Sequence, residues 1–328
     1  MSIAGGAWRR ETAPKRVSNG CAGPNVSRMR GTHLVGSLPA PGPGQAMDQA
    51  LAVLGRGLRS LPGDRSDHDK VLQGSIRDFG HVRKFERSFP LFLEARERAE
   101  MPRLAFQVGV PGDLDVALFV LGPQGALLRR KPFTDATVAE ITAIHAAGGD
   151  DVIFQVEIPV ELVAVARMPR ALQPAIAVLL ARGVANLARR SPSGARFGVH
   201  LCLRDTNHRA LRDTGPLVTM ANALARAWPD DRPLEFMHAP FAAAEIPPPV
   251  EPSWYAPLSG LRLKPGTRFI AGVAHEDQAL DEQRAIVELI EHAVGRPVGI
   301  SHSCGLGRRS PEAAERALWR VAELANPV

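Results

Sequence analysis

The sequence has few aromatic side chains and no long apolar run, and each shortage excludes a class of protein. Aromatic residues make up 5% of the 328 residues and include a single tyrosine, which leaves little for stacking on nucleic-acid bases. No apolar run reaches the roughly 18 residues that a membrane-spanning helix needs, and the N-terminus lacks the apolar core of a secretion signal. We therefore expect a cytoplasmic protein that binds neither nucleic acid nor a membrane.

Cysteine is also scarce, with three residues in the whole chain. A chain without a secretion signal and with so few cysteines is not built on a disulfide framework. Cys202 and Cys304 each follow a strand-like run, whereas Cys21 lies in a polar N-terminal tail. Two of the three cysteines are therefore candidates for chemistry, and we interpret Cys21 as incidental.

The net charge of +6 is concentrated at the N-terminus. Residues 1–30 carry six basic side chains against Glu11 alone, so five of the six net charges lie there. This segment has no sustained apolar period, and we predict a disordered basic extension over residues 1–30. One domain is predicted over residues 31–328, and its nearly neutral charge also argues against a nucleic-acid groove.

Strand-like and helix-like segments alternate along this domain. The predicted strands cover residues 32–38, 104–110, 151–157, 196–202, 234–237, 267–274 and 297–301, with one further strand placed at 71–75. The predicted helices cover residues 46–58, 135–147, 172–188, 215–228 and 278–294, and two more begin near Asp113 and after Ser310. Such alternation predicts an α/β fold, specifically a (β/α)8 TIM barrel, with a doubly wound open sheet as the alternative. No glycine-rich dinucleotide fingerprint follows a strand, which disfavours the nucleotide-binding form of that alternative.

Candidate metal ligands lie near the predicted strand ends. His200 and Cys202 are two residues apart on a strand, so their side chains face the same way. Imidazole and thiolate are ligands that suit Zn²⁺, although the pair alone is equally compatible with a buried strand end. Cys304 follows another strand, and Glu235 lies in the strand between them. Because the ends of barrel strands meet at one mouth, the sequence predicts a zinc site made by His200, Cys202, Glu235 and Cys304.

Five short motifs, taken in order, resemble the catalytic C-terminal barrel of the cobalamin-independent methionine synthase family. This barrel belongs to a superfamily shared with uroporphyrinogen decarboxylase. The segment 35–39 (VGSLP) is similar to the family's Gly-Ser-aromatic-Pro signature, and 155–159 (QVEIP) is similar to its Gln-x-Asp-Glu-Pro motif. The family's zinc ligands match His200-Leu201-Cys202, Glu235 and Cys304-Gly305-Leu306.

The resemblance implies a zinc-dependent methyltransferase of methionine biosynthesis that transfers a methyl group to a zinc-bound thiolate. The family's folate-binding N-terminal half has no counterpart in these residues, and the Asp that holds the homocysteine amino group is replaced by Glu157. We therefore expect a small-molecule thiol as acceptor, not necessarily homocysteine. The methyl donor is expected to be a methylated corrinoid or folate carried by another protein.

Three further residues receive roles, each with a plainer alternative. Ser37 is predicted to bind a substrate carboxylate, or else to be satisfied by backbone. Glu157 is predicted to bind a substrate ammonium, or else to pair with an arginine. His275 is predicted to protonate the leaving group, or else to be a satisfied histidine at a barrel end. His238 and His302 flank the ligand positions. They are predicted to lie around the ligands or to face solvent, with replacement of Glu235 by either one as the alternative.

Two other functions remain open. A uroporphyrinogen-decarboxylase-like lyase uses the same barrel without a metal, and the His-x-Cys pair with Cys304 argues against it. A non-catalytic zinc-stabilised barrel that binds a small thiol is the other. A zinc hydrolase is disfavoured, because the sequence has no His-x-His pair and thiolate-rich sites are less suited to making hydroxide.

Overall fold

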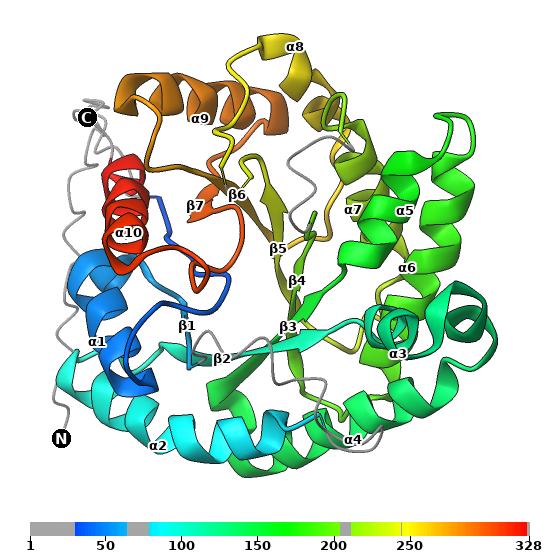
Figure 1. Cartoon of the computed structure of the whole chain (residues 1–328), viewed down its shortest axis with the longest axis horizontal. Coiled ribbons are helices and arrows are strands. Elements are labelled where there is room, and N and C mark those ends of the chain that lie inside the picture. The colour runs from blue at the N-terminus through cyan, green and yellow to red at the C-terminus, as the bar shows by residue number, and fades with distance from the viewer. Residues whose placement is uncertain (1–29, 64–78, 204–210, 244, 327–328) are drawn as a thin grey trace, which may run out of the picture.

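The fold is a curled parallel sheet surrounded by helices (Figure 1). The computed structural model describes residues 30–63, 79–203, 211–243 and 245–326. Within them, seven strands lie side by side in chain order, every neighbouring pair parallel. The strands are β1 (Ser60–Pro62), β2 (Ala105–Pro111), β3 (Val152–Glu157), β4 (Arg196–His200), β5 (Leu234–Pro240), β6 (Arg268–Ala274) and β7 (Gly299–His302).

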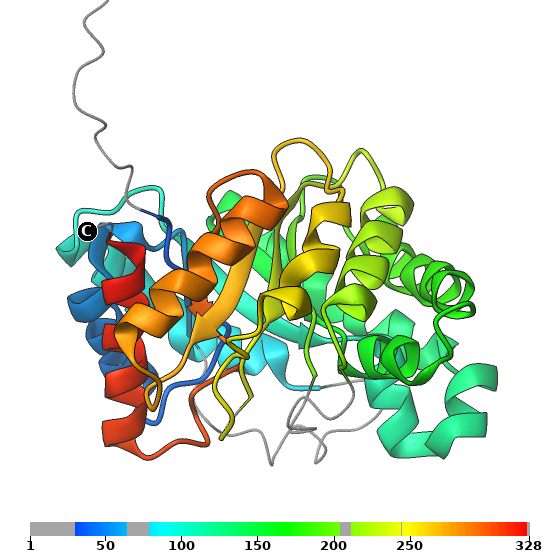
Figure 2. The same ribbon diagram turned by 90° about the horizontal axis from the view of Figure 1, so that it is seen from above.

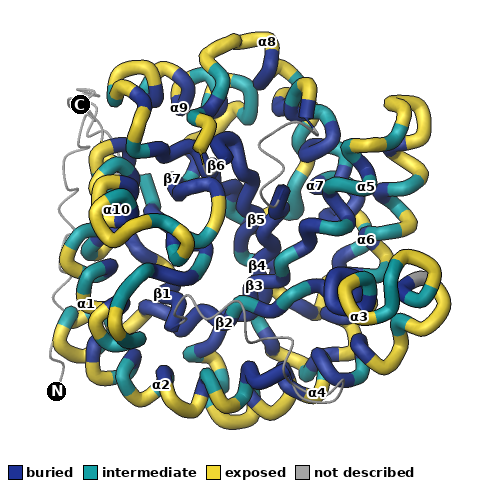
Figure 3. Tube along the Cα trace, in the orientation of Figure 1, coloured by how far each residue is buried: buried dark blue, intermediate teal, exposed yellow. Residues whose placement is uncertain are grey.

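The helices stand on the outer side of the sheet in both ribbon views (Figure 1, Figure 2). They are α1 (Pro43–Leu54), α2 (His81–Arg98), α3 (Asp113–Leu128), α4 (Lys131–Gly148), α5 (Pro159–Arg167), α6 (Gln173–Arg190), α7 (Gly215–Ala227), α8 (Pro252–Tyr255), α9 (Leu280–Val294) and α10 (Pro311–Ala325). Figure 3 shows the strands buried and the outer turns of the helices exposed. No helix within the described ranges is both long and apolar enough to cross a membrane.

Local sequence accounts for the helix that closes the fold. Ser310 is the N-cap of α10, and its side chain accepts a hydrogen bond from the Ala313 amide at 3.2 Å. Proline follows at the first helical position, and Glu312 stands in the first turn. The apolar stripe from Ala314 to Leu324 is buried, as its helical spacing predicts.

The α/β class is confirmed, but the first predicted strand is not a strand over its length. Thr32 forms isolated parallel bridges with both Leu58 and Ile300, and among the described residues no further full strand closes the seven-stranded sheet. After Thr32, the carbonyls of Leu34 and Val35 accept hydrogen bonds from side-chain amides. Gln107 donates to the Leu34 carbonyl at 2.8 Å, and Gln155 donates to the Val35 carbonyl at 2.5 Å. Side chains of β2 and β3 thus replace the ladder bonds that a strand would make.

Two other predictions concern segments early in the chain. The strand placed at 71–75 and the extension at 1–30, apart from Arg30, lie outside the described residues. The strand that does pair with β2 is β1, at Ser60–Pro62. Helix α4 begins a turn earlier than predicted, so Asp135 lies inside it and pairs with Lys131 at 2.8 Å.

Candidate functional site

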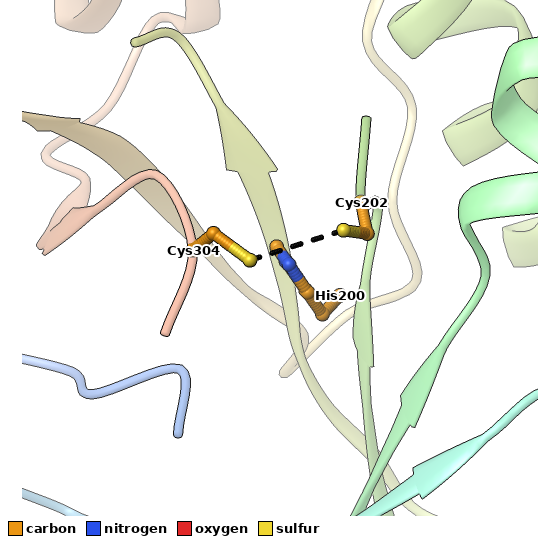
Figure 4. Close-up of side chains that lie close together, drawn as sticks. All are labelled: His200, Cys202 and Cys304. Carbon is orange, nitrogen blue, oxygen red and sulfur yellow. Dashed lines mark hydrogen bonds between the residues drawn. The ribbon is translucent and has the colours of Figure 1, made fainter. Parts of the chain in front are cut away.

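Three of the four predicted zinc ligands meet at the carboxyl end of the sheet. His200 is the last residue of β4, Cys202 follows two residues later, and Cys304 lies two residues beyond the end of β7. Although two strands separate β4 from β7, the curl of the sheet brings their ends together. The ligand atoms of His200, Cys202 and Cys304 lie within 4.8 Å of one another. Figure 4 shows the two sulfur atoms on either side of the His200 ring, and they are 3.9 Å apart.

The electrostatics of this cluster suit a cation. The hydrogen bond with Cys202 is the main cause that lowers the pKa of the Cys304 thiol well below its usual value, and the neighbouring His200 acts in the same direction. The Nε2 atom of His200 is buried without a hydrogen-bond partner among the described residues. A thiol poised to ionise beside a second sulfur and a vacant imidazole nitrogen fits a zinc ion.

A set of uncharged imidazoles lies behind the cluster. His238 on β5 is fully buried, and burial and the neighbouring His200 lower its pKa well below the usual value. Burial also lowers the pKa of His302 to about 4, and it lowers that of His33 well below the usual value. These rings therefore add no positive charge near neutral pH. They leave the cluster attractive to a cation.

Glu235, the fourth predicted ligand, lies at the opposite end of the sheet. The prediction ended its strand at Met237, but β5 continues to Pro240, which pairs with Gly272 of β6. Glu235 is consequently the second residue of a seven-residue strand. Its carboxylate pairs with Arg196, the first residue of β4, at 2.5 Å and 3.2 Å. The structure therefore separates Glu235 from the other three predicted ligands.

Ser37 and Glu157 both lie at the end of the sheet that carries the cluster. The Ser37 carbonyl accepts a hydrogen bond from the Leu306 amide at 2.8 Å, and a Cβ placed on Gly305 would lie 2.9 Å from the Ser37 hydroxyl. Glycine at 305 thus allows Ser37 to sit against the turn that holds Cys304. Glu157 ends β3 and is the register partner of His200. Neither contact identifies a substrate.

His275 follows the last residue of β6 and is fully buried. Its Nδ1 atom accepts a hydrogen bond from the Asp277 amide at 3.2 Å, so a neutral ring carries its proton on Nε2. Gln283 fixes the backbone here, accepting from the His275 amide at 3.0 Å and donating to its carbonyl at 2.7 Å. The structure places His275 at the correct end of the sheet but outside the His/Cys/Cys cluster.

Sequence reasoning missed an acid that is fully buried. Glu161, in the first turn of α5, is fully buried, and neither carboxylate oxygen has a hydrogen-bond partner in the described part of the chain. Burial raises the pKa of Glu161 to about 8. No sequence signal distinguishes it, because an acid in a first helical turn is ordinarily an exposed partner of the helix dipole.

The fold resembles several solved structures. A protein from Listeria monocytogenes described as a vitamin-B12-independent methionine synthase shares 11% identity, with 86% of each chain covered and a TM-score of 0.51. A B12-independent methionine synthase from Shewanella sp. W3-18-1, solved with selenomethionine, shares 14% over 71% of this chain and 65% of that chain, with a TM-score of 0.46. A methyltransferase from Methanosarcina mazei shares 17% over 77% and 68%, with a TM-score of 0.40.

No protein-family model matches the sequence, and no curated protein matches it. At 11% identity, the likeness to the Listeria protein establishes a shared TIM-barrel-like fold. The chemistry of this chain is therefore inferred from its own residues.

Proposed function

We propose that this chain is a zinc-dependent methyltransferase that acts on a small-molecule thiol. The observation that supports the proposal is the convergence of His200, Cys202 and Cys304 within 4.8 Å. One imidazole and two thiolates form a set of three protein ligands, as in catalytic zinc sites that keep one position open. The open position would receive the sulfur of the substrate, since Glu235 is held elsewhere by Arg196.

Zinc bound at this cluster would favour the deprotonated, nucleophilic form of a substrate thiol near neutral pH. The chain's own residues would hold the rest of the substrate. The Ser37 hydroxyl lies beside the turn of Cys304 and is suited to a substrate carboxylate. Glu157, the register partner of His200, is suited to a substrate ammonium group.

In the transfer, a sulfur–carbon bond forms while the bond between the methyl group and its donor breaks. The donor keeps the electron pair of the broken bond, and the thiol proton is lost to solvent. A methylated corrinoid or folate carried by a partner protein is the proposed donor. For a nitrogen leaving group, the imidazolium form of His275 is the proposed proton source. Its Nε2 atom gives the proton, and the ring returns to the neutral form whose Nδ1 atom accepts from the Asp277 amide.

Metal content measured on purified variants tests the proposal first. We expect about one zinc per chain in the wild type, and its loss in His200→Ala and Cys304→Ser. Glu235→Gln is the matched control, because it removes a predicted ligand that the structure places in an ion pair, and it should keep its zinc. A wild-type protein that binds no zinc under reducing conditions would overturn the proposal.

Methyl transfer is then measured with the zinc-loaded protein, methylated corrinoid or folate, and a panel of small thiols. A thioether product that requires Cys304 supports the proposed reaction. Stoichiometric zinc without transfer to any thiol would favour a zinc-stabilised barrel that binds a thiol without reacting.

A further inference from the structure

We infer that His238 is a positioning residue that fixes the tautomer of His200 and so directs the Nε2 atom of His200 toward the metal. This inference rests on the zinc site of the proposed function, but it concerns a hydrogen-bond chain that exists without the metal. His200 and His238 are register partners on β4 and β5. Their side chains therefore lie next to each other on the inner face of the sheet.

The direction of each hydrogen bond in the series His200–His238–His302 follows from its last acceptor, a main-chain carbonyl. Nε2 of His238 lies 3.0 Å from the main-chain carbonyl of His302, which can only accept, so this nitrogen carries a proton. In a neutral ring the other nitrogen is then bare, and Nδ1 of His238 accepts. That atom is 2.7 Å from Nδ1 of His200, which must therefore be the donor.

The tautomer of His200 follows directly. With the proton on Nδ1, its Nε2 atom carries a free lone pair, and this is the buried atom that lacks a partner among the described residues. A ligating histidine whose second nitrogen donates to a fixed acceptor is oriented and made more basic, and losing such a partner typically costs 10–100-fold in metal affinity.

The same series of hydrogen bonds connects the two parts of the cluster, which are His200 with Cys202 at the end of β4 and Cys304 after β7. His302, which supplies the carbonyl for His238, uses its own Nδ1 atom to contact the carbonyl of Cys304. His200 on β4 is thereby linked through β5 to the turn after β7. Figure 4 shows β5, the olive strand, behind the cluster, and in the sheet β5 lies between β4 and β7.

Gly272 provides the room that His238 needs. A Cβ on Gly272 would lie 2.7 Å from Nε2 of His238 and 2.8 Å from its Cε1 atom. Gly272→Ala should therefore displace the His238 ring without altering any residue of the cluster. It gives a second, independent way to break the chain of hydrogen bonds.

Zinc affinity of a matched set of variants tests the inference. His238→Leu and Gly272→Ala should bind zinc about 10–100-fold more weakly than the wild type. His238→Gln should stay close to the wild type, because its amide can accept from His200 and donate to the His302 carbonyl. His33→Leu is the control. It removes another buried imidazole, one that bonds to Gln155, and it should leave zinc affinity unchanged.

Two spectroscopic readouts separate a positioning role from ligation or from folding. In the metal-free protein, ¹⁵N NMR of histidine-labelled samples should show the Nδ1–H tautomer for His200 in the wild type and its loss in His238→Leu. X-ray absorption of the zinc-loaded proteins should give the same count of sulfur and nitrogen ligands in both.

Three results would overturn the inference. The first is an Nε2–H tautomer of His200 in the wild type, and the second is wild-type affinity in both His238→Leu and Gly272→Ala. The third is a nitrogen ligand lost in His238→Leu, which would make His238 a ligand. Because the NMR measurement needs no metal, it tests the chain of hydrogen bonds even if the protein proves not to bind zinc.

Discussion

Replacing Glu161 with glutamine should stabilise the protein at neutral and alkaline pH. The carboxyl group of Glu161 is fully buried and lacks a hydrogen-bond partner among the described residues. The nearby guanidinium of Arg130 is already held by Asp113, at 2.7 Å and 2.5 Å. Burial, as the largest cause, raises the pKa of Glu161 from 4.5 to about 8, and Asp113 and Asp115 add to the increase.

The sign and size of the effect follow from proton linkage. The folded protein keeps this proton up to about pH 8, whereas the unfolded chain loses it near pH 4.5. The contribution of the protonated acid is fully present below pH 4.5 and declines by about 1.4 kcal/mol per pH unit until about pH 8. The cost of keeping Glu161 protonated is therefore about 3 kcal/mol at pH 7 and about 4–5 kcal/mol above pH 8. Glutamine has a similar shape and no such cost.

Urea unfolding followed by tryptophan fluorescence measures this difference. The free energy of unfolding of Glu161→Gln minus that of the wild type should be about 1 kcal/mol at pH 5 and should rise steadily to pH 8. Using the difference cancels the titration of all other groups, which the two proteins share. Parallel curves from pH 5 to pH 8 would refute the reasoning, because Glu161 would then titrate alike in the folded and unfolded protein.

Two further predictions concern packing and the reactive thiol. Gly198→Ala should lower the free energy of unfolding by about 1–3 kcal/mol, because its Cβ would lie 2.1 Å from the Phe236 ring. Gly36→Ala, whose Cβ would have no atom of the described residues within 4 Å, should change the free energy of unfolding by less than about 0.5 kcal/mol. Equal thermal stability of the two variants would contradict the close packing at Gly198. In metal-free protein at pH 7, iodoacetamide should modify the exposed Cys304 faster than an ordinary thiol. Cys202→Ala should slow this reaction, because the hydrogen bond with Cys202 is the main cause that lowers the pKa of Cys304. Mass spectrometry gives the rate, added zinc should protect Cys304, and an unchanged rate in Cys202→Ala would contradict the assigned cause.

The part of the site that depends on local strand geometry could be predicted from the sequence. The alternation of side chains along a strand places His200 and Cys202 on one face, and the parallel arrangement places Cys304 at the same end. Each of these inferences requires only that the position of a strand end is predicted to within a residue or two. The structure brings these three residues together, and whether they bind zinc stays a prediction.

The position of Glu235 in its strand could not be predicted from the local sequence pattern. The apolar run of β5 is interrupted by His238, yet the pairing with β6 continues to Pro240. The true end of the strand is set by hydrogen bonds to a neighbour more than thirty residues away in the chain. The same limit applies to the segment after Thr32, where the amides of Gln107 and Gln155 take the place of strand partners.

Helix α2 was missed for a different reason. Its surface is rich in charge, and Pro90 lies inside it, which in sequence reads as a break. The buried stripe of Phe85, Phe92 and Ala95 is stabilised by packing against the sheet, which overrides the local signal.

The hydrogen-bond chain from His200 to Cys304 can be completed only after β7 has been synthesised, because it runs through His302. Cys202 and Cys304 are 102 residues apart, and His238, between them, needs the carbonyl of His302 as its acceptor. A nascent chain that ends before β7 carries only the His-x-Cys half of the cluster, with its imidazole not yet oriented. If the cluster binds a metal ion as proposed, its capture would be coupled to the docking of the last strand, and the finished sheet, not the emerging chain, would select the ion.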